Sequence, residues 1–305
     1  TEALIERQNR CYCIHGLVYR ELPEKYCHYE GSRSIFGAVQ MISSSVIINR
    51  IKYYFILNRS KLAKYGIYQV FYYIYRKYYD VLTVYYSFGQ KNVLCPACGY
   101  AGRKYVGNSC PRCWSGARHR LLALYIANVV KLSPSCQIVD IAPNISTSYI
   151  FDKRHYPNYV SIDLDSPAAE IHMDLTNLGI KNDVIDLIVC YHVLEHIKDD
   201  TRSMQELYRV LKLGGTAILQ VPFSGANDRT FESDEYDCTD RAMNLKLYGH
   251  PTHVRRYGKI DYLAKLKSSG FDVQMDTYAN SFSDYEVAKY GLDKNEILFV
   301  CRKMG

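Results

Sequence analysis

Residues 186–223, DLIVCYHVLEHIKDDTRSMQELYRVLKLGGTAILQVPF, carry the strongest fold signal in the chain. The almost wholly apolar run over 186–192 is typical of a central parallel strand that is covered on both faces. An amphipathic pattern predicts a helix over 200–212 that ends at a Gly-Gly pair, and an apolar strand is expected over 216–223. Strand, helix and strand in this order indicate a βαβ unit.

The same alternation continues on both sides of this unit. Further strands are expected at 137–142, 159–165, 169–175, 272–279 and 296–303, and further helices at 117–131, 146–155 and 260–269. Residues 117–305 are therefore predicted to form an α/β domain with a parallel sheet and helices on both faces.

Charge and composition are unevenly spread along the 305 residues. The net charge is +7, but residues 1–90 and 91–140 each carry +6, whereas residues 141–305 carry −5. Such a basic front favours an anionic partner. The longest apolar stretches are broken well before the ~20 residues of a spanning helix. No secretory signal is visible, and the 11 cysteines are odd in number, so a reducing, cytoplasmic location is expected.

Four cysteines predict a zinc ribbon over residues 91–116. The run LCPACGYAGRKYVGNSCPRCW holds two CxxC pairs, which is the spacing of a tetrathiolate zinc site. The expected ligands are Cys95, Cys98, Cys110 and Cys113. Four thiolates leave no position for a catalytic water, so the zinc is expected to be structural. Two unrelated CxxC turns or disulfides are the alternative. Cys11, Cys13, Cys27 and His28 have irregular spacing and are interpreted as ordinary thiols rather than a second metal cluster.

Residues 1–90 form a basic, tyrosine-rich extension that is predicted to be mainly helical. An apolar stripe with Lys and Arg on the other side indicates an amphipathic helix over 59–81. Packing of this helix on the α/β domain or on a partner is the favoured interpretation. Peripheral contact with a membrane surface is the alternative.

The run 186–223 resembles the second half of class I S-adenosylmethionine-dependent methyltransferases of the type 11-like group. It has the VLEH segment, a helix, the LKLGG turn and a strand in the family order. Members with a CPxCG…CPxC ribbon look closer still, because the Arg-His-Arg at 118–120 and LYGHPTHVRRYG at 247–258 also match. The resemblance implies a Rossmann-like, mostly parallel seven-stranded sheet with its last strand antiparallel, and S-adenosyl-L-methionine as cofactor.

Carboxylates at or just after the ends of the first three strands are the main cofactor candidates. Asp163 can accept both ribose hydroxyls, with Asp165 as a rival. The resemblance implies that Asp174 accepts from the adenine amino group and that Asp140 orients the methionine end. The full predicted set is Asp140, Ala142, Pro143, Asn144, Asp163, Leu164, Asp174, Leu175 and Tyr191.

The turn after the first strand departs from the family pattern Asp-x-Gly-x-Gly-x-Gly. Ala142, Asn144 and Ser146 stand where the family has glycines, and glycine lets the backbone approach a ligand closely. These residues are small, so the turn can still fit. A methyltransferase-like binding protein without activity is the alternative.

The catalytic candidates are His192, His253 and Tyr191. The segment HVLEH at 192–196 would lie beside the reactive methyl group, where His192 is predicted to be a general base and His196 a hydrogen-bonding residue. HxxEH is also an inverted zinc-protease motif, which requires a continuous helix. The histidines straddle the end of an apolar strand, so that alternative is disfavoured.

The acceptor side is expected to be built by the insertion at 224–257, in which a cluster of acids precedes a basic cluster with Arg255, Arg256 and Tyr257. This pattern suits a lid over a polar acceptor, and an oxygen of a sugar, a glycan or a small metabolite is predicted. The alternative is an RNA or DNA methyltransferase that uses the basic ribbon to bind phosphates. Its basic residues are Arg103, Lys104, Arg112, Arg118 and Arg120.

Overall fold

The computed structural model describes residues 91–223, 228–233 and 240–305. The N-terminal extension 1–90, with its expected helix at 59–81 and the cysteines before residue 30, lies outside the described residues. The same is true of 224–227 and 234–239, which belong to the expected lid.

A small antiparallel sheet opens the described chain. It pairs β1 (Val93–Leu94) with β2 (Ala101–Gly102), and a bridge between Val106 and Ser109 closes the following turn. Gly99 sits after the first CxxC pair with φ of 72°, a left-handed conformation that glycine adopts without a Cβ penalty. The predicted ribbon is therefore built from two tight turns that face each other.

A seven-stranded sheet organises residues 117–305. Its strands are β3 (Ile138–Ile141), β4 (Tyr159–Asp163), β5 (Ile171–His172), β6 (Ile185–Tyr191), β7 (Leu211–Gln220), β8 (Asp272–Asp276) and β9 (Leu298–Arg302). Their order is β5-β4-β3-β6-β7-β9-β8, and β9 runs antiparallel to both of its neighbours. The predicted α/β fold with a mostly parallel sheet is confirmed.

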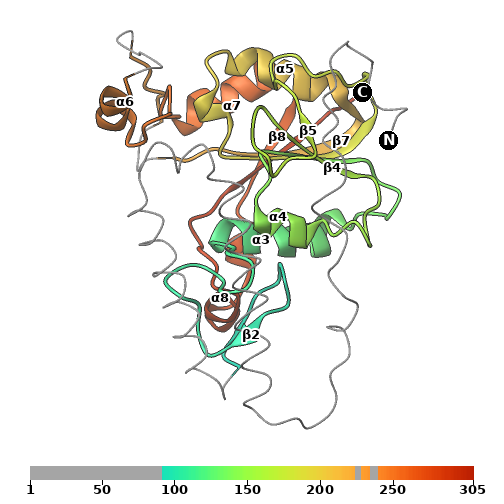
Figure 1. The fold of residues 1–305 in the computed structure, drawn as a ribbon, viewed down its shortest axis with the longest axis vertical. Helices are drawn as coiled ribbons and strands as arrows, with labels where there is room; N and C mark the ends of the chain where they lie inside the picture. The colour runs from blue at the N-terminus through green and yellow to red at the C-terminus, as the bar shows by residue number, and fades with distance from the viewer. Residues whose placement is uncertain (1–90, 224–227, 234–239) are drawn as a thin grey trace. The chain divides into compact units, whose positions relative to one another are not determined.

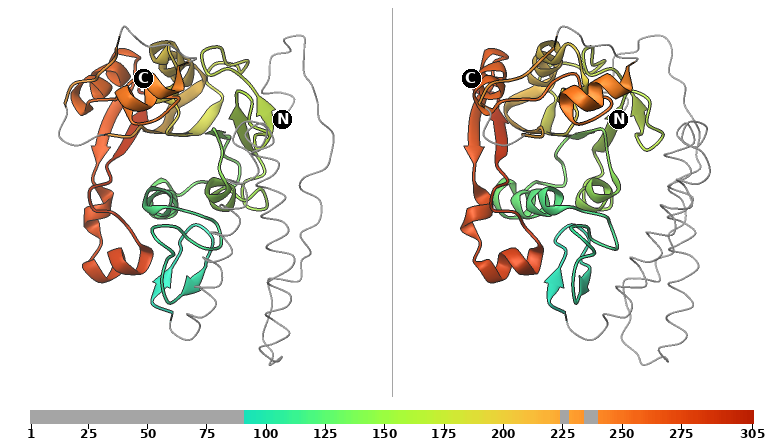
Figure 2. Two further views of the ribbon diagram at one scale, coloured as in Figure 1. Left: turned by 60° about the vertical axis from the view of Figure 1, so that its left-hand side comes forward. Right: turned by 90° about the vertical axis from the view of Figure 1, so that its left-hand side faces the viewer.

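Helices cover both faces of this sheet (Figure 1). The helices are α3 (Ala117–Tyr125), continued by the π-helical turn η3 (Ile126–Val130), α4 (Ile145–Ile150), α5 (Asp200–Val210), α6 (Arg241–Tyr248), α7 (Lys259–Ser268) and α8 (Asp284–Tyr290). Figure 2 shows from two further sides that α5 and α7 lie over one face and α3 and α4 over the other.

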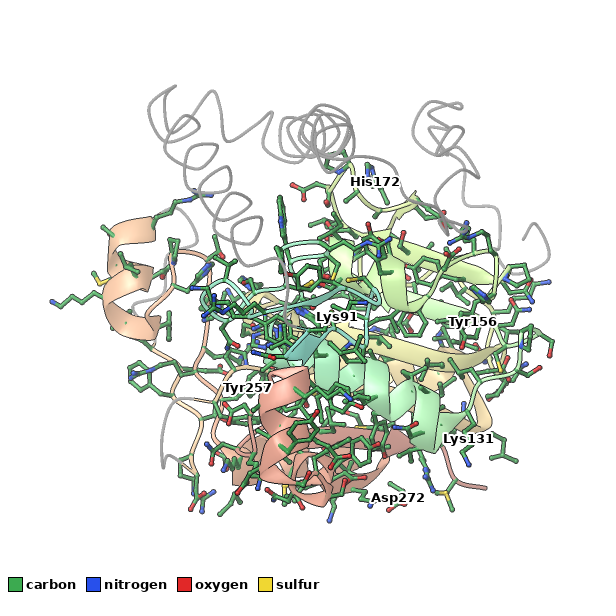
Figure 3. All side chains as sticks on the ribbon, turned by 90° about the horizontal axis from the view of Figure 1, so that it is seen from below. Lys91, Lys131, Tyr156, His172, Tyr257 and Asp272 are labelled. Atoms are coloured by element: carbon green, nitrogen blue, oxygen red, sulfur yellow. The ribbon has the colours of Figure 1, made fainter. Side chains whose placement is uncertain are left out.

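Alternate residues of β6 supply the two apolar layers that these helices require. Ile188 and Cys190 pack in the layer under α5 and α7, whereas Leu187 and Val189 pack in the layer under α3. All four side chains are fully buried, as expected for a central parallel strand. Figure 3 views the side chains from the α3 side, with Lys131 at the outer end of η3.

Several predicted bounds were wrong. The helix expected over 200–212 ends at Val210, and Gly214–Gly215 lie inside β7, because Leu211 already pairs with Ile185 of β6. The helix expected over 146–155 ends at Ile150, and the strand expected over 169–175 is only Ile171–His172. Helices α6 and α8 were not predicted. Within the described ranges, no helix combines the length and the apolar character needed to cross a bilayer.

Candidate cofactor and acceptor site

The carboxyl ends of three adjacent strands form the floor of the candidate site. Ile141 of β3 pairs with Ile162 of β4 on one side and with Cys190 of β6 on the other. The strand order reverses between β3 and β6, and ligands of open α/β sheets bind beyond the carboxyl ends at such a switch point. The residues that follow β3, β4 and β6 therefore come together at one edge.

The turn after β3 adopts a glycine-like backbone without glycine. Ala142 has φ of 54°, in the left-handed region that a glycine would occupy at no cost. Asn144 caps α4, because its Oδ1 accepts hydrogen bonds from the backbone N–H groups of Ser146 (2.8 Å) and Thr147 (3.2 Å). The hydroxyl of Ser146 donates to the carbonyl of Cys113, so the third glycine position is tied to the ribbon instead.

Asp140 lies beneath this turn rather than on its surface. The residue is only 1% exposed, and its Oδ2 accepts a 3.0 Å hydrogen bond from the hydroxyl of Tyr159. Burial raises the pKa of Asp140 to about 7, which the hydrogen bonds with Thr147 and Tyr159 oppose. Its predicted contact with the methionine end of the cofactor remains a prediction.

Asp163 and Asp174 each keep one carboxylate oxygen for a ligand. Oδ1 of Asp163 accepts from the backbone N–H groups of Asp165 (3.0 Å) and Ser166 (2.9 Å), and its Oδ2 has no hydrogen-bond partner in the described chain. Oδ1 of Asp174 accepts from the N–H and the hydroxyl of Thr176, both at 2.8 Å. Carboxylates held in this way suit ribose and adenine donors, so the residues present fit S-adenosylmethionine.

The remaining cofactor candidates differ in exposure. Leu164 beside Asp163 is 67% exposed, whereas Leu175 is buried in the core. Pro143 is partly exposed within the turn after β3. Their predicted contacts with the cofactor remain predictions.

A histidine cluster, His192, His196, His250 and His253, lies beyond the end of β6, and three of its members, His192, His196 and His253, contact Glu195. Oε1 of Glu195 lies 3.5 Å from Nδ1 of His192 and 3.9 Å from Nε2 of both His196 and His253. The carboxylate is 1% exposed, and neither of its oxygens has a hydrogen-bond partner among the described residues. His192 has φ of 58°, a conformation that strained residues adopt at functional sites.

The segment that carries His253 is firmly attached to this loop. The N–H of Val254 donates to the carbonyl of Glu195 at 2.9 Å. Arg255 is 3% exposed and donates to the carbonyls of Leu194 and Lys198 and to the carboxylate of Glu232. Burial lowers the pKa of His253 to about 4, and the charge of His196 adds to this effect.

One expectation about this region changes, and one disfavoured alternative is ruled out. Arg255 and Tyr257 were expected to face an acceptor, but both are buried: Arg255 bonds to the loop backbone, and the Tyr257 hydroxyl donates to Asp200. The protease alternative fails as well, because only Leu194–His196 is helical, as a single 3₁₀ turn (η4). Two histidines of the motif therefore do not share a continuous helix.

Tyr191 does not join His192 and His253. Its side chain packs in the apolar layer under α3, and its ring stacks on His119 with centroids 6.2 Å apart. The hydroxyl is buried with no hydrogen-bond partner in the described part of the chain, and burial raises its pKa well above the usual value. Sequence reasoning also gave no role to Glu195, although a carboxylate between apolar Leu194 and a histidine was a usable signal.

The four ribbon cysteines have the geometry of a tetrahedral zinc site. The Sγ atoms of Cys95 and Cys113 are 3.7 Å apart, and so are those of Cys98 and Cys110. Sulfurs at a Zn–S distance of 2.3 Å occupy tetrahedral corners about 3.8 Å apart. The Ser115 hydroxyl lies 3.2 Å from Sγ of Cys95 and supports this site from the second coordination sphere. Zn²⁺ bound here would hold the two turns together.

The strand order and the turns at this edge are those of a Rossmann-like α/β domain. Residues 113–219 match the family model for a methyltransferase domain. A Mycolicibacterium smegmatis protein that bears the name S-adenosylmethionine-dependent methyltransferase is 28% identical over 109 residues. That match spans 35% of this chain and 37% of the relative. Over residues 113–219 the chain is therefore similar to S-adenosylmethionine-dependent methyltransferase domains.

Two solved structures are similar to this chain over part of its length. A chain from the complex that contains the Haloferax volcanii Trm112 methyltransferase activator is 17% identical, with a TM-score of 0.42 over 62% of this chain and 91% of that one. An S-adenosylmethionine-dependent methyltransferase from Mesorhizobium loti is 16% identical, with a TM-score of 0.40 over 59% of this chain and 97% of that one.

Proposed function

We propose that this chain is an enzyme that transfers a methyl group from S-adenosylmethionine to an oxygen of a polar acceptor, such as a sugar, a glycan or a small metabolite. The observation that carries the proposal is the convergence of His192 and His253 on buried Glu195, just beyond β6 and beside the switch point. When bound, S-adenosylmethionine supplies a methyl group activated on a sulfonium. The protein must then align a hydroxyl with that methyl and remove its proton.

Glu195 and His192 are arranged for the proton step. The carboxylate lies 3.5 Å from Nδ1 of His192, and a hydrogen on that nitrogen would leave Nε2 free to accept a proton. His192 is 28% exposed, so an acceptor can reach it. Asp163 and Asp174 hold the ribose and the adenine in this proposal, each through its remaining carboxylate oxygen.

The basic residues of the ribbon give less support to a nucleic-acid acceptor than the net charge of the ribbon suggests. Arg120 is fully buried and donates to backbone carbonyls, so it cannot bind a phosphate. Arg112 is exposed, but it donates to the carbonyl of Cys98. Arg103 and Lys104 remain exposed. We therefore keep RNA or DNA as an outcome of the acceptor test rather than as the favoured acceptor.

Calorimetry with S-adenosylmethionine and its demethylated product tests cofactor binding by the zinc-loaded full chain. Binding of both is expected, and absence of binding would support the inactive, methyltransferase-like alternative. Transfer of a radiolabelled methyl group to carbohydrates, phenols and RNA then identifies the acceptor class. Labelling of RNA alone, weakened by salt, would overturn the polar small-acceptor proposal.

A matched pair of histidine variants tests the base. His192→Asn should lower the transfer rate by about 100-fold or more while S-adenosylmethionine still binds, since a positioned base contributes at least that much. His155→Asn is the control, because His155 is exposed and distant in sequence from the histidine cluster. Equal rates for both variants would remove His192 from the mechanism.

A further inference from the structure

The geometry points to a second metal site, in which His196, His250, His253 and Glu195 bind a divalent transition-metal ion of the Zn²⁺ class. This site is separate from the cysteine ribbon and lies beyond the end of β6. Among the residues that the structure describes, the ribbon and these three histidines are the groups in which metal-ligating side chains converge.

The ligand atoms already lie close together. One ring nitrogen from each of His196, His250 and His253 lies within 4.8 Å of the other two. Oε1 of Glu195 is 3.9 Å from Nε2 of His196 and 3.9 Å from Nε2 of His253. These separations are too long for hydrogen bonds. They match two ligand atoms that each lie about 2.1 Å from one ion, which places them roughly 3–4 Å apart.

Glu195 requires a positive partner. Taking a carboxylate out of water costs several kcal/mol unless a charge or hydrogen bonds compensate. In the described ranges every ion-pair contact of Glu195 is with a histidine, and neither oxygen accepts a hydrogen bond. The nearby Arg255 is committed to Glu232 and to backbone carbonyls. A bound cation would satisfy this carboxylate directly.

The hydrogen bonds of His196 prepare its other nitrogen for a metal. Nδ1 lies 3.2 Å from the carbonyl of Thr252, and a carbonyl can only accept, so Nδ1 carries the hydrogen. In the neutral ring Nε2 is then unprotonated and faces the carboxylate of Glu195 at 3.9 Å. Two acceptors that face each other call for a cation between them. A ring N–H bound to a backbone carbonyl is also the usual outer support of a metal-ligating histidine.

Imidazole and carboxylate donors together select the kind of ion. Three nitrogens with one oxygen suit Zn²⁺ and its neighbours in the first transition row, whereas Mg²⁺ and Ca²⁺ prefer oxygen ligands alone. His196 is 32% exposed and His250 is exposed, so an ion can enter and keep a position open to solvent or substrate. Thr252 links the two rings, with its hydroxyl 2.9 Å from Nδ1 of His196 and 3.1 Å from Nδ1 of His250.

The place of the site suggests what the ion would do, and this part rests on the proposed function. His192, the proposed base, lies 3.5 Å from the same oxygen, Oε1 of Glu195, through its Nδ1. An acceptor hydroxyl on the open metal position would bind as an oxygen ligand and lose its proton more readily. The acceptor class would then include hydroxyls able to bind a metal, such as those of a vicinal diol.

Titration of the metal-free full chain with Co²⁺ under reducing conditions, without S-adenosylmethionine, tests the metal site. Binding of two equivalents is expected. One should develop the intense thiolate-to-cobalt absorption of the cysteine site, and the other should bind without a thiolate band. Elemental analysis after equilibration with Zn²⁺ and desalting should also find two zinc ions per chain. One equivalent in both measurements would overturn the proposal.

Variants separate loss of the site from loss of the fold. The double variant His196→Ala/His253→Ala should keep the thiolate band and lose the second equivalent. His155→Ala, which removes an exposed histidine elsewhere, should keep both. Glu195→Gln should weaken the second equivalent at least tenfold. Two equivalents retained by the double variant would contradict the proposal, whether or not the cofactor binds in the separate calorimetric test.

Discussion

The guanidinium of Arg120 donates a 2.6 Å hydrogen bond to the backbone carbonyl of Gly291, 171 residues further along the chain. The same side chain is fully buried, donates to the carbonyl of Asn108 and lies 4.1 Å from the ring centre of Tyr105. One arginine thus joins α3, the ribbon and the end of α8. The Ser146 hydroxyl also donates a hydrogen bond to the Cys113 carbonyl of the ribbon. The ribbon therefore supports the turn after β3, which belongs to the candidate cofactor site.

Arg120→Lys should destabilise the chain strongly. A lysine keeps the positive charge but lacks the planar guanidinium that donates to several carbonyls at once. The buried carbonyl oxygens that Arg120 binds would therefore lose their hydrogen-bond donors. We expect the free energy of unfolding in urea to fall by about 2–4 kcal/mol. Arg103→Lys, on the exposed surface of the ribbon, should change it by less than about 0.5 kcal/mol. Similar small effects for both variants would mean that Arg120 does not join these elements.

Substitutions at Ala142 test the strain in the turn after β3. Ala142→Gly removes a left-handed penalty of about 1–2 kcal/mol and loses about 0.4–1 kcal/mol to unfolded-state entropy. The net effect on the free energy of unfolding should be a gain of about 0–1.6 kcal/mol. Ala142→Val should lose about 1–3 kcal/mol, because a β-branched residue disfavours positive φ more strongly.

Thermal unfolding measures both changes at Ala142. Ala168→Gly is the control, since Ala168 is not among the described residues with positive φ and should lose stability on this substitution. An Ala142→Gly variant that is destabilised as much as Ala168→Gly would show that the turn relaxes to another conformation in solution.

The pair Asp163→Asn and Asp165→Asn distinguishes the two ribose candidates. Oδ1 of Asp163 is already held by two backbone N–H groups, which aims its second oxygen at a ligand. Charged hydrogen bonds to ribose hydroxyls are worth about 1.5–3 kcal/mol, so Asp163→Asn should weaken S-adenosylmethionine binding by roughly 10- to 100-fold. Asp165→Asn should change the dissociation constant measured by calorimetry by less than about twofold. The reverse order would assign the ribose to Asp165.

Asp140 should make stability depend on pH. Burial raises its pKa from 3.8 to about 7, so between these values the folded chain holds a proton that the unfolded chain has released. Stability contributed by protonated Asp140 is therefore present at low pH, falls as the pH rises from about 4 to 7, and is lost above 7. A pKa change of one unit corresponds to about 1.4 kcal/mol, so the effect amounts to up to a few kcal/mol.

Asp140→Asn should remove this dependence, because an amide does not ionise. In urea denaturation without cofactor, the variant should be more stable than the wild type at pH 8, with a gap that closes toward pH 4.5. Tyr159→Phe should extend the window to higher pH, since the Tyr159 hydroxyl favours the ionised carboxyl. Equal losses at both pH values for Asp140→Asn would mean that the carboxyl is ionised throughout.

Much of the fold could be predicted because its signals are local. A short apolar run such as 186–192 strongly favours a buried strand. The observed strand β6 lies within one residue of the expected bounds. The boundary at Val210 could not be predicted, since helix and strand signals overlap there. The long-range pairing of Leu211 with Ile185 ends the helix at Val210, four residues before Gly214.

The ribbon is the clearest case of local determination. Four cysteines in two short turns can meet at one ion almost regardless of the rest of the chain, so their spacing alone predicted a site whose sulfurs now lie 3.7 Å apart. Asp163 and Asp174 could be proposed for a similar reason, because Asp163 ends β4 and Asp174 lies two residues beyond β5, and both strands could be recognised from their own residues. Their contacts with the cofactor remain predictions.

The histidine cluster and the role of Arg120 arise from contacts between distant segments. Glu195 and His253 are far apart in sequence, and they meet because the Val254 N–H bonds to the Glu195 carbonyl after the chain has crossed β7. Local patterns carry no information on which loops the strand order brings to one edge. Burial then leaves Glu195 without a hydrogen bond and lets Arg120 join three elements. Burial is a property of the folded chain and cannot be read from either residue alone.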